Sequence, residues 1–125
     1  MTPNPEHIMA VLEEMRRVCR DAWRQGLLSG CNGNVSCRLP TPYDGHICVT
    51  RSGAAKGRLT LDDCCLADMR SGVTFSGGPA SSELGVHLAL YRALPHCGAV
   101  LHSHPRHLLA LSLVLRNPGD FLRLS

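Results

Sequence analysis

Apolar residues recur at helical spacing near the start of the chain, at positions 8, 11, 12, 15, 18, 19, 22 and 23. These positions fall on one side of a helix, and Asn4 and Pro5 supply a cap and a proline suited to the first turn. We therefore expect an amphipathic helix that ends near Gly26 or Gly30. Charged residues on its other side are typical of a solvated surface.

Short apolar or alternating segments after this helix predict strands in the second part of 29–38 and at 46–50, 64–69 and 97–104, with turn residues between them. A second helix is expected from Ser81, because Leu84, His87, Leu88 and Tyr91 form a stripe and Pro95 follows. A third segment, 106–115, is apolar nearly all round and predicts a well-buried helix.

Length and composition narrow the class of protein. At 125 residues the chain is expected to form a single domain over 1–125 with a real core. The net charge of +3 is spread over scattered Lys and Arg, and aromatic residues are few, so nucleic acid is not expected as a partner. A mild positive charge suits an anionic small substrate.

The cysteines and the apolar runs indicate a cytoplasmic protein. The seven cysteines are an odd number and contain no C-x-x-C pair, which argues against a disulfide framework and a zinc ribbon. Reduced thiols in the cytoplasm are the simplest account. The N-terminus lacks the apolar region of a signal peptide, and the longest apolar run, 108–115, is too short to span a membrane. No membrane partner is therefore expected.

The segment 100–105, Val-Leu-His-Ser-His-Pro, contains the strongest candidate chemistry. On a strand, His102 and His104 point to the same side, and two imidazoles a few Å apart make a natural pair of metal ligands. Pro105 disfavours helix for His104 and suits the first turn of a helix that follows. The alternative is one exposed histidine beside one hydrogen-bonded core histidine.

Three other segments combine Gly, Asn or Ser with a turn or a helix start, where backbone N–H groups can converge on an anion. They contain, in order, Gly33 and Asn34, Ser52 and Gly53, and Ser81 and Ser82. An ordinary turn or a helix cap explains each of them when it is taken alone.

Glu83 lies in the first turn of the second predicted helix, where it either interacts with the helix dipole or serves as a metal ligand or base. His87, one turn further on, is interpreted as a core histidine with one hydrogen bond. Lys56 is assigned to a polar connection over 54–58.

The order and spacing of four motifs resemble the class II aldolase/adducin family, whose best-known member type is L-fuculose-1-phosphate aldolase. The resemblance covers about Glu6 to Leu115. Its motifs are Gly33-Asn34-Val35-Ser36, Thr50-Arg51-Ser52-Gly53, Ser81-Ser82-Glu83 and His102-Ser103-His104-Pro105-Arg106-His107.

This resemblance implies an α/β fold, a three-layer α/β/α sandwich around a largely antiparallel sheet, commonly assembled as a homotetramer. It implies Zn²⁺, or another divalent metal, held by His102, His104 and, at rest, Glu83. Glu83 would also exchange protons in the reaction. The implied phosphate site of a small phosphorylated sugar consists of Gly33, Asn34, Ser52, Gly53, Ser81 and Ser82.

The resemblance implies an aldolase-type lyase that cleaves a sugar phosphate through a metal-stabilised enediolate. A dehydratase or epimerase relative is an alternative, because Ser52-Gly53-x-x-Lys56-Gly57 is similar to methylthioribulose-1-phosphate dehydratases. A non-catalytic, adducin-like module is another. In the family a third histidine ligand lies well downstream, and nothing up to Ser125 matches it. The expected domain is therefore incomplete at its C-terminus. Three explanations stay open: the chain is a fragment, a natural truncation, or a family member that borrows the missing parts from a partner.

Overall fold

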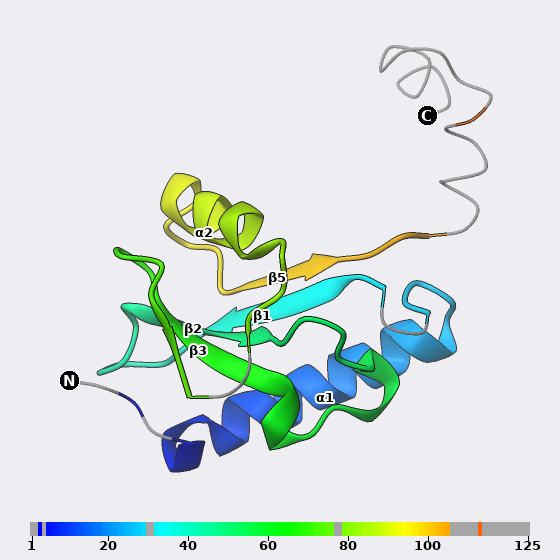
Figure 1. Ribbon diagram of the computed structural model, residues 1–125, viewed down its shortest axis with the longest axis horizontal. Coiled ribbons are helices and arrows are strands. Elements are labelled where there is room, and N and C mark those ends of the chain that lie inside the picture. Colours follow the sequence, from blue (N-terminus) through cyan, green and yellow to red (C-terminus); the bar gives the residue numbers. More distant parts are fainter. Residues whose placement is uncertain (1–2, 4, 30–31, 77–78, 106–112, 114–125) are drawn as a thin grey trace.

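In a computed structural model of the chain, the described residues form an antiparallel sheet of five strands (Figure 1). The structure describes residues 3, 5–29, 32–76, 79–105 and 113. The strand order is β4-β3-β2-β1-β5, so β1 lies between β2 and β5. The strands are β1 (Asn34–Arg38), β2 (His46–Thr50), β3 (Cys64–Asp68), β4 (Thr74–Phe75) and β5 (Ala99–His102).

Among the described residues, one α-helix covers each face of the sheet (Figure 1). Helix α1 (Met9–Arg24) continues a short 3-10 helix, Pro5–Ile8, and packs on one face. Helix α2 (Leu84–Ala93) packs on the other. Two further 3-10 turns, Lys56–Arg58 and Leu61–Asp63, lie between β2 and β3. This arrangement confirms the expected three-layer α/β/α sandwich with an antiparallel sheet.

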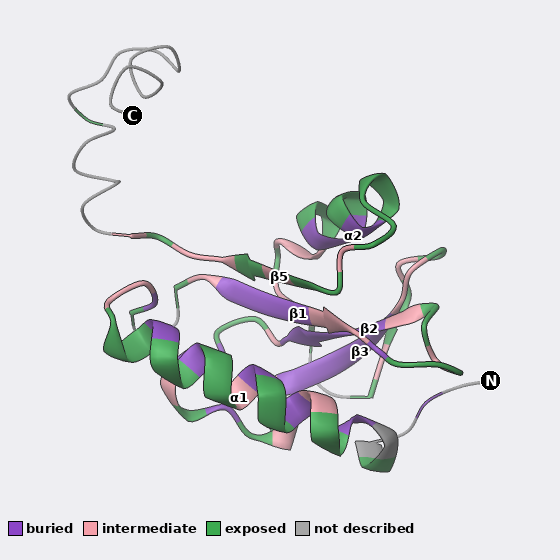
Figure 2. Ribbon diagram, turned by 180° about the vertical axis from the view of Figure 1, so that it is seen from behind, coloured by how far each residue is buried: buried purple, intermediate pink, exposed green. Residues whose placement is uncertain are grey.

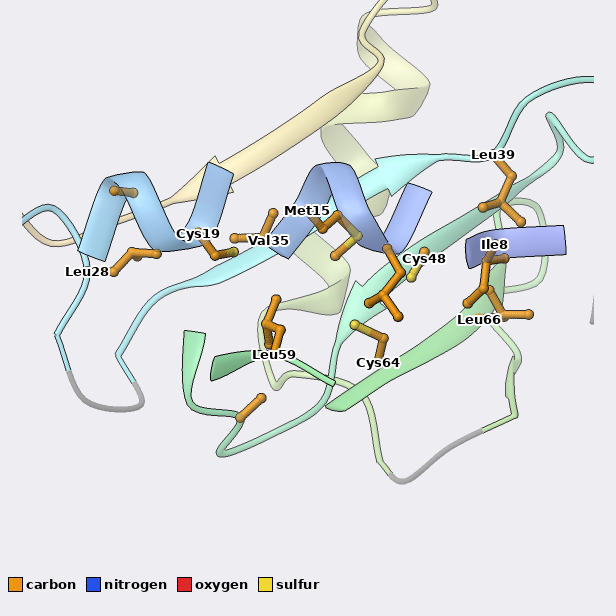
Figure 3. Packing of buried hydrophobic residues seen from close by; sticks show 13 residues of the cluster. Ile8, Met15, Cys19, Leu28, Val35, Leu39, Cys48, Leu59, Cys64 and Leu66 are labelled. Carbon is orange, nitrogen blue, oxygen red and sulfur yellow. The ribbon is translucent and has the colours of Figure 1, made fainter. Parts of the chain in front are cut away.

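The apolar side of α1 forms the larger part of the core. Leu12, Met15 and Cys19 are almost completely buried and belong to one cluster with Val35 and Cys48 of the sheet. Figure 3 shows Met15 and Cys19 beside these strand residues. The buried positions recur along α1 at helical spacing and face the sheet, while the exposed positions face away (Figure 2). Burying each large apolar side chain contributes about 1.5–3 kcal/mol, so this contact fixes α1 on the sheet.

A second apolar cluster lies between the sheet and α2. It contains Ile47 and Val49 of β2, which pack with Leu88 and Tyr91 of α2. Cys48 lies between Ile47 and Val49 and faces α1 instead, because successive strand side chains point to opposite faces. Both faces of β2 are therefore buried, which explains its nearly continuous apolar sequence.

Strand β1 differs from its neighbours because its α2-facing side is polar. Asn34, Ser36 and Arg38 alternate with Val35 and Cys37, which pack in the α1 cluster. Asn34 and Ser36 are buried and hydrogen-bonded to side chains of α2, as buried polar groups require. This polar stripe begins with Asn34 at the N-terminal end of β1, where the candidate site lies.

Several elements begin or end one to three residues from their predicted bounds, namely the end of β3, the start of α2 and the start of β5. Helix α1 begins at Met9, because the first predicted turn is 3-10. Strand β5 ends at His102, so His104 lies beyond the last sheet residue. The two-residue strand β4 was not predicted. The helix expected over 106–115 lies outside the described residues except for Leu113, which is exposed.

Within the described parts of the chain, no helix is both long enough and apolar enough to cross a membrane.

Candidate active site

The described residues form a cleft of about 280 Å³ between the ends of β1 and β5 and the loops that flank β2 and α2. Its volume suits a small molecule. All nine site residues predicted from the sequence lie along it, together with three that were not predicted. The lining residues are Asn32, Gly33, Asn34, Arg51, Ser52, Gly53, Lys56, Ser81, Ser82, Glu83, His102 and His104.

Strand pairing and loop hydrogen bonds bring these distant segments together. Asn34 of β1 is the register partner of His102 of β5. The backbone N–H of Ser52 donates to the Pro79 carbonyl at 2.9 Å, and that of Ser81 donates to the Thr50 carbonyl at 3.0 Å. The loop after β2 and the loop before α2 are thus held against each other at one side of the cleft.

The close approach of β1 and β5 requires glycine at position 33. Gly33 has a φ of +80°, in the left-handed region that favours glycine. A Cβ atom at this position would lie 2.6 Å from the carbonyl oxygen of His102 and 2.7 Å from Leu28 Cδ2. Glycine at this position therefore allows the chain that leads into β1 to pass close to His102.

Two backbone N–H groups in the loops are available to an anion. The N–H of Gly53 and the N–H of Ser82 donate to no acceptor among the described residues. The neighbouring N–H of Glu83 is already used, because it donates to Ser81 Oγ at 3.2 Å. In these two loops, only part of the predicted anion-binding segment therefore remains free to bind a ligand through the backbone.

Two cationic side chains at the cleft were not predicted as site residues. Arg51 pairs with Asp63 at 3.3 Å, and its Nε is buried without a partner among the described residues. Lys56 is only 2% exposed although it lines the cleft. The only sequence signal for Lys56 was its place in Ser52-Gly53-x-x-Lys56-Gly57. Together these cations give the loop side of the cleft positive charge.

His102 and His104 lie beside each other at the cleft. Their ring centroids are 4.9 Å apart, with the planes tilted by 46°. His102 Nδ1 is buried and has no hydrogen-bond partner among the described residues. The pair therefore offers two imidazoles to a divalent cation. Glu83 lines the same cleft, but no group of three described His, Cys, Asp or Glu side chains is close enough to hold a metal.

His87 of α2 lies behind Asn34 and is completely buried. Its Nδ1 is 2.6 Å from Ser36 Oγ, and its Nε2 is hydrogen-bonded to Asn34 Oδ1. The sequence predicted a core histidine with one hydrogen bond, so the second bond, to a residue of the cleft, is new. Burial, with a smaller effect of nearby His102, lowers the pKa of His87.

Curated proteins similar to this chain have different reaction names. The chain is 38% identical over 112 residues to a methylthioribulose-1-phosphate dehydratase from Serratia proteamaculans, which covers 90% of this chain and 53% of that protein. It is 36% identical over 104 residues to a 3-oxo-tetronate 4-phosphate decarboxylase from Haemophilus influenzae, covering 83% and 48%. The chain thus spans about half the length of these relatives.

A solved structure and a family model are also similar to this chain. The structure of an L-fuculose-1-phosphate aldolase from Thermus thermophilus has a TM-score of 0.70 and 34% identity, over 84% of this chain and 52% of that chain. The model of the class II aldolase and adducin N-terminal domain matches residues 13–121. Together with the three-layer fold and the order of its motifs, this places the chain in the class II aldolase/adducin family.

Proposed function

We propose that this chain carries the phosphate-binding and proton-transfer parts of the active site of a lyase that acts on a small phosphorylated sugar with a divalent cation. The observation that carries the proposal is the cleft itself, because four segments far apart in the sequence meet there. Three of them offer anion-binding groups and the fourth offers paired imidazoles. If each segment were only a turn or a helix cap, nothing would require the four segments to meet at one cleft.

The phosphate group would bind at the loop side of the cleft. This side of the cleft has the N–H groups of Gly53 and Ser82, the hydroxyls of Ser52 and Ser82 and, in its lining, the cationic side chains of Arg51 and Lys56. Charge-assisted hydrogen bonds to phosphate are stronger than neutral ones. Binding the phosphate firmly would hold the carbon atoms of the substrate in a fixed place beside the imidazoles and Glu83.

His102 and His104 would hold the cation, for which Zn²⁺ is the first candidate because imidazole suits it. The unpaired, buried Nδ1 of His102 and the close packing of the two rings fit this role. When bound, the cation supplies Lewis-acid stabilisation of negative charge on substrate oxygens. Two imidazoles leave ligand positions to be filled, and Glu83 is the predicted resting ligand.

Glu83 would carry the proton that such a reaction moves. It lies at the start of α2 and lines the same cleft as the phosphate-side loops and the histidine pair. A carboxylate so placed can take a proton from a substrate hydroxyl or carbon and return it at a later step. Replacing Glu83 with Gln would keep the side-chain shape and remove this ability.

Two reactions are candidates for this site. Aldol cleavage is the first, and the resemblance in fold to a structure described as L-fuculose-1-phosphate aldolase supports it. Dehydration is the second, and the relative described as methylthioribulose-1-phosphate dehydratase and the Ser52-Gly53-x-x-Lys56-Gly57 motif favour it. Both remove a proton from the substrate while negative charge develops on oxygen, so they place the same demands on Glu83. Product analysis with candidate sugar phosphates separates them.

Zinc binding by the full chain tests the cation part of the proposal. Metal-free protein should bind about one Zn²⁺ per chain at micromolar concentration, and His102→Ala should weaken this binding at least tenfold. His96→Ala is the matched control, because His96 is exposed and does not line the cleft. Failure of the wild-type chain to bind, or an equal effect of both variants, would contradict the proposal.

Phosphoglycolohydroxamate, which mimics an enediolate phosphate, distinguishes the lyase from a non-catalytic, adducin-like module. A working site should be stabilised against heat by this ligand in the presence of Zn²⁺, since ligand at 100 times its Kd adds about 2.7 kcal/mol. A module that has lost the chemistry should show no shift. Assembly as a homotetramer and a cytoplasmic location stay predictions, and sedimentation measurements test the first.

A further inference from the structure

A chain of four hydrogen-bonded side chains runs through the buried space between β1 and α2. It begins at Tyr91 OH, which is 2.7 Å from Ser36 Oγ. It continues through His87 and ends at Asn34, the only one of the four that lines the cleft. All four residues are at most 4% exposed. A polar network of this kind must be satisfied internally, so its donors and acceptors can be assigned.

The amide oxygen of Asn34 fixes the direction of the whole chain. An amide oxygen only accepts, so the His87 Nε2 beside Asn34 Oδ1 must carry the proton. In a neutral ring Nδ1 is then an acceptor, and Ser36 Oγ–H donates to it. Ser36 Oγ in turn accepts from Tyr91 O–H. Every donor then has an acceptor, whereas in the reverse direction the Tyr91 O–H would find none among these four side chains.

We propose that His87 is a positioning residue that turns the Asn34 amide so that its Nδ2–H₂ group donates into the cleft, toward the phosphate of the substrate. No described residue accepts a hydrogen bond from Asn34 Nδ2, and Asn34 lines the cleft from the β1 side. The opposite orientation would present the amide oxygen to the anion and repel it. The identity of the anion rests on the proposed function, whereas the position of the proton on the His87 ring does not.

The protonation state of His87 can be measured without any ligand. In ¹⁵N-labelled full-length chain at pH 7.5, long-range ¹H–¹⁵N correlations distinguish the two neutral tautomers and the charged ring. We expect the proton on Nε2. A proton on Nδ1, or on both nitrogens, would overturn the inference, because Asn34 Oδ1 would then lose its donor or Ser36 would have to reverse.

Two variants separate positioning from a merely structural role. His87→Gln keeps a donor and an acceptor near Asn34 and Ser36, whereas His87→Leu removes both. Inorganic phosphate is the probe, and its Kd is measured by titration once circular dichroism has shown that both variants are folded. His87→Leu should raise the Kd about tenfold, the typical effect of a lost hydrogen bond to a charged group, and His87→Gln by less than about threefold. Equal losses in both variants would overturn the inference.

A double-mutant cycle with Asn34→Ala gives the decisive readout. If His87 acts only through Asn34, His87→Leu should change the Kd for phosphate by less than about twofold in the Asn34→Ala background. Additive losses would mean that His87 acts through the general packing of α2 and would overturn the inference. If the wild-type chain binds no phosphate, the phosphate part of the proposed function fails, and the tautomer measurement alone decides the role of His87.

Discussion

Replacing Gly33 with Ala should destabilise the fold where β1 and β5 meet. Two effects add at this position. A left-handed φ costs a residue with a Cβ atom about 1–2 kcal/mol. The new methyl group would also lie 2.6 Å from the His102 carbonyl oxygen, which is a backbone atom in the β1–β5 ladder. Leu28 Cδ2, at 2.7 Å, belongs to a side chain that can rotate, so the carbonyl is the harder obstacle.

The expected loss of stability follows from these two effects. Forcing an extra carbon into a packed site costs about 1–3 kcal/mol, so Gly33→Ala should lose about 2–5 kcal/mol in total. Gly53→Ala is the matched control, because Gly53 has a φ of +78° but no atom within 4 Å of its Cβ position. The control should therefore lose only the conformational part, about 1–2 kcal/mol.

Urea unfolding of both variants measures the difference. With an m-value of about 2 kcal/mol per M, Gly33→Ala should lower the midpoint by about 1–2.5 M and Gly53→Ala by about 0.5–1 M. Far-ultraviolet circular dichroism and the fluorescence of Trp23, the single tryptophan, provide two probes of the transition. Equal midpoints for the two variants would refute the argument that His102 excludes a side chain at position 33.

Two further predictions concern the core and the acid stability. Met15→Ala should cost about 2–5 kcal/mol in urea unfolding, because Met15 is 1% exposed in the α1 cluster, whereas Val18→Ala, 46% exposed on the same helix, should change stability by less than about 0.5 kcal/mol. Similar losses in both would show that α1 does not pack as described. The backbone N–H groups of Ser71 and Arg70 lower the pKa of the Asp68 carboxyl from its ordinary 3.8. The stability that ionised Asp68 contributes is therefore present above about pH 4 and is lost as the pH falls through the folded-state pKa. Asp68→Asn should reduce this loss of stability in acid. An unchanged dependence of stability on pH in the variant would contradict the role given to Asp68.

Local patterns in the sequence were sufficient for most of the sheet and both described helices. Strand β2 has the predicted bounds, because its apolar run lies between clear turn signals. Strand β4 could not be predicted, since two residues carry no pattern and it exists only through its pairing with β3. Strand β5 stops at His102, where its partner β1 begins at Asn34. Strand ends are thus set by neighbours that are distant in the sequence.

The structure brings all nine residues named from the motifs into one cleft, while their role in binding stays a prediction. The cationic residues Arg51 and Lys56, which also line the cleft, gave almost no signal in the sequence. A lysine in a polar loop is normally exposed, and only the fold shows that Lys56 is buried. The second hydrogen bond of His87 depends in the same way on Asn34, 53 positions away in the chain.

The position of β5 beside β1 has a consequence for synthesis on the ribosome. Asn34 leaves the exit tunnel long before His102, yet the two face each other across one ladder. While β5 is still untranslated, a nascent chain could form the hairpin of β1 and β2 but would have no histidine pair beside it. The cleft beside His102 is therefore completed only once β5, the last of the described strands, has been made.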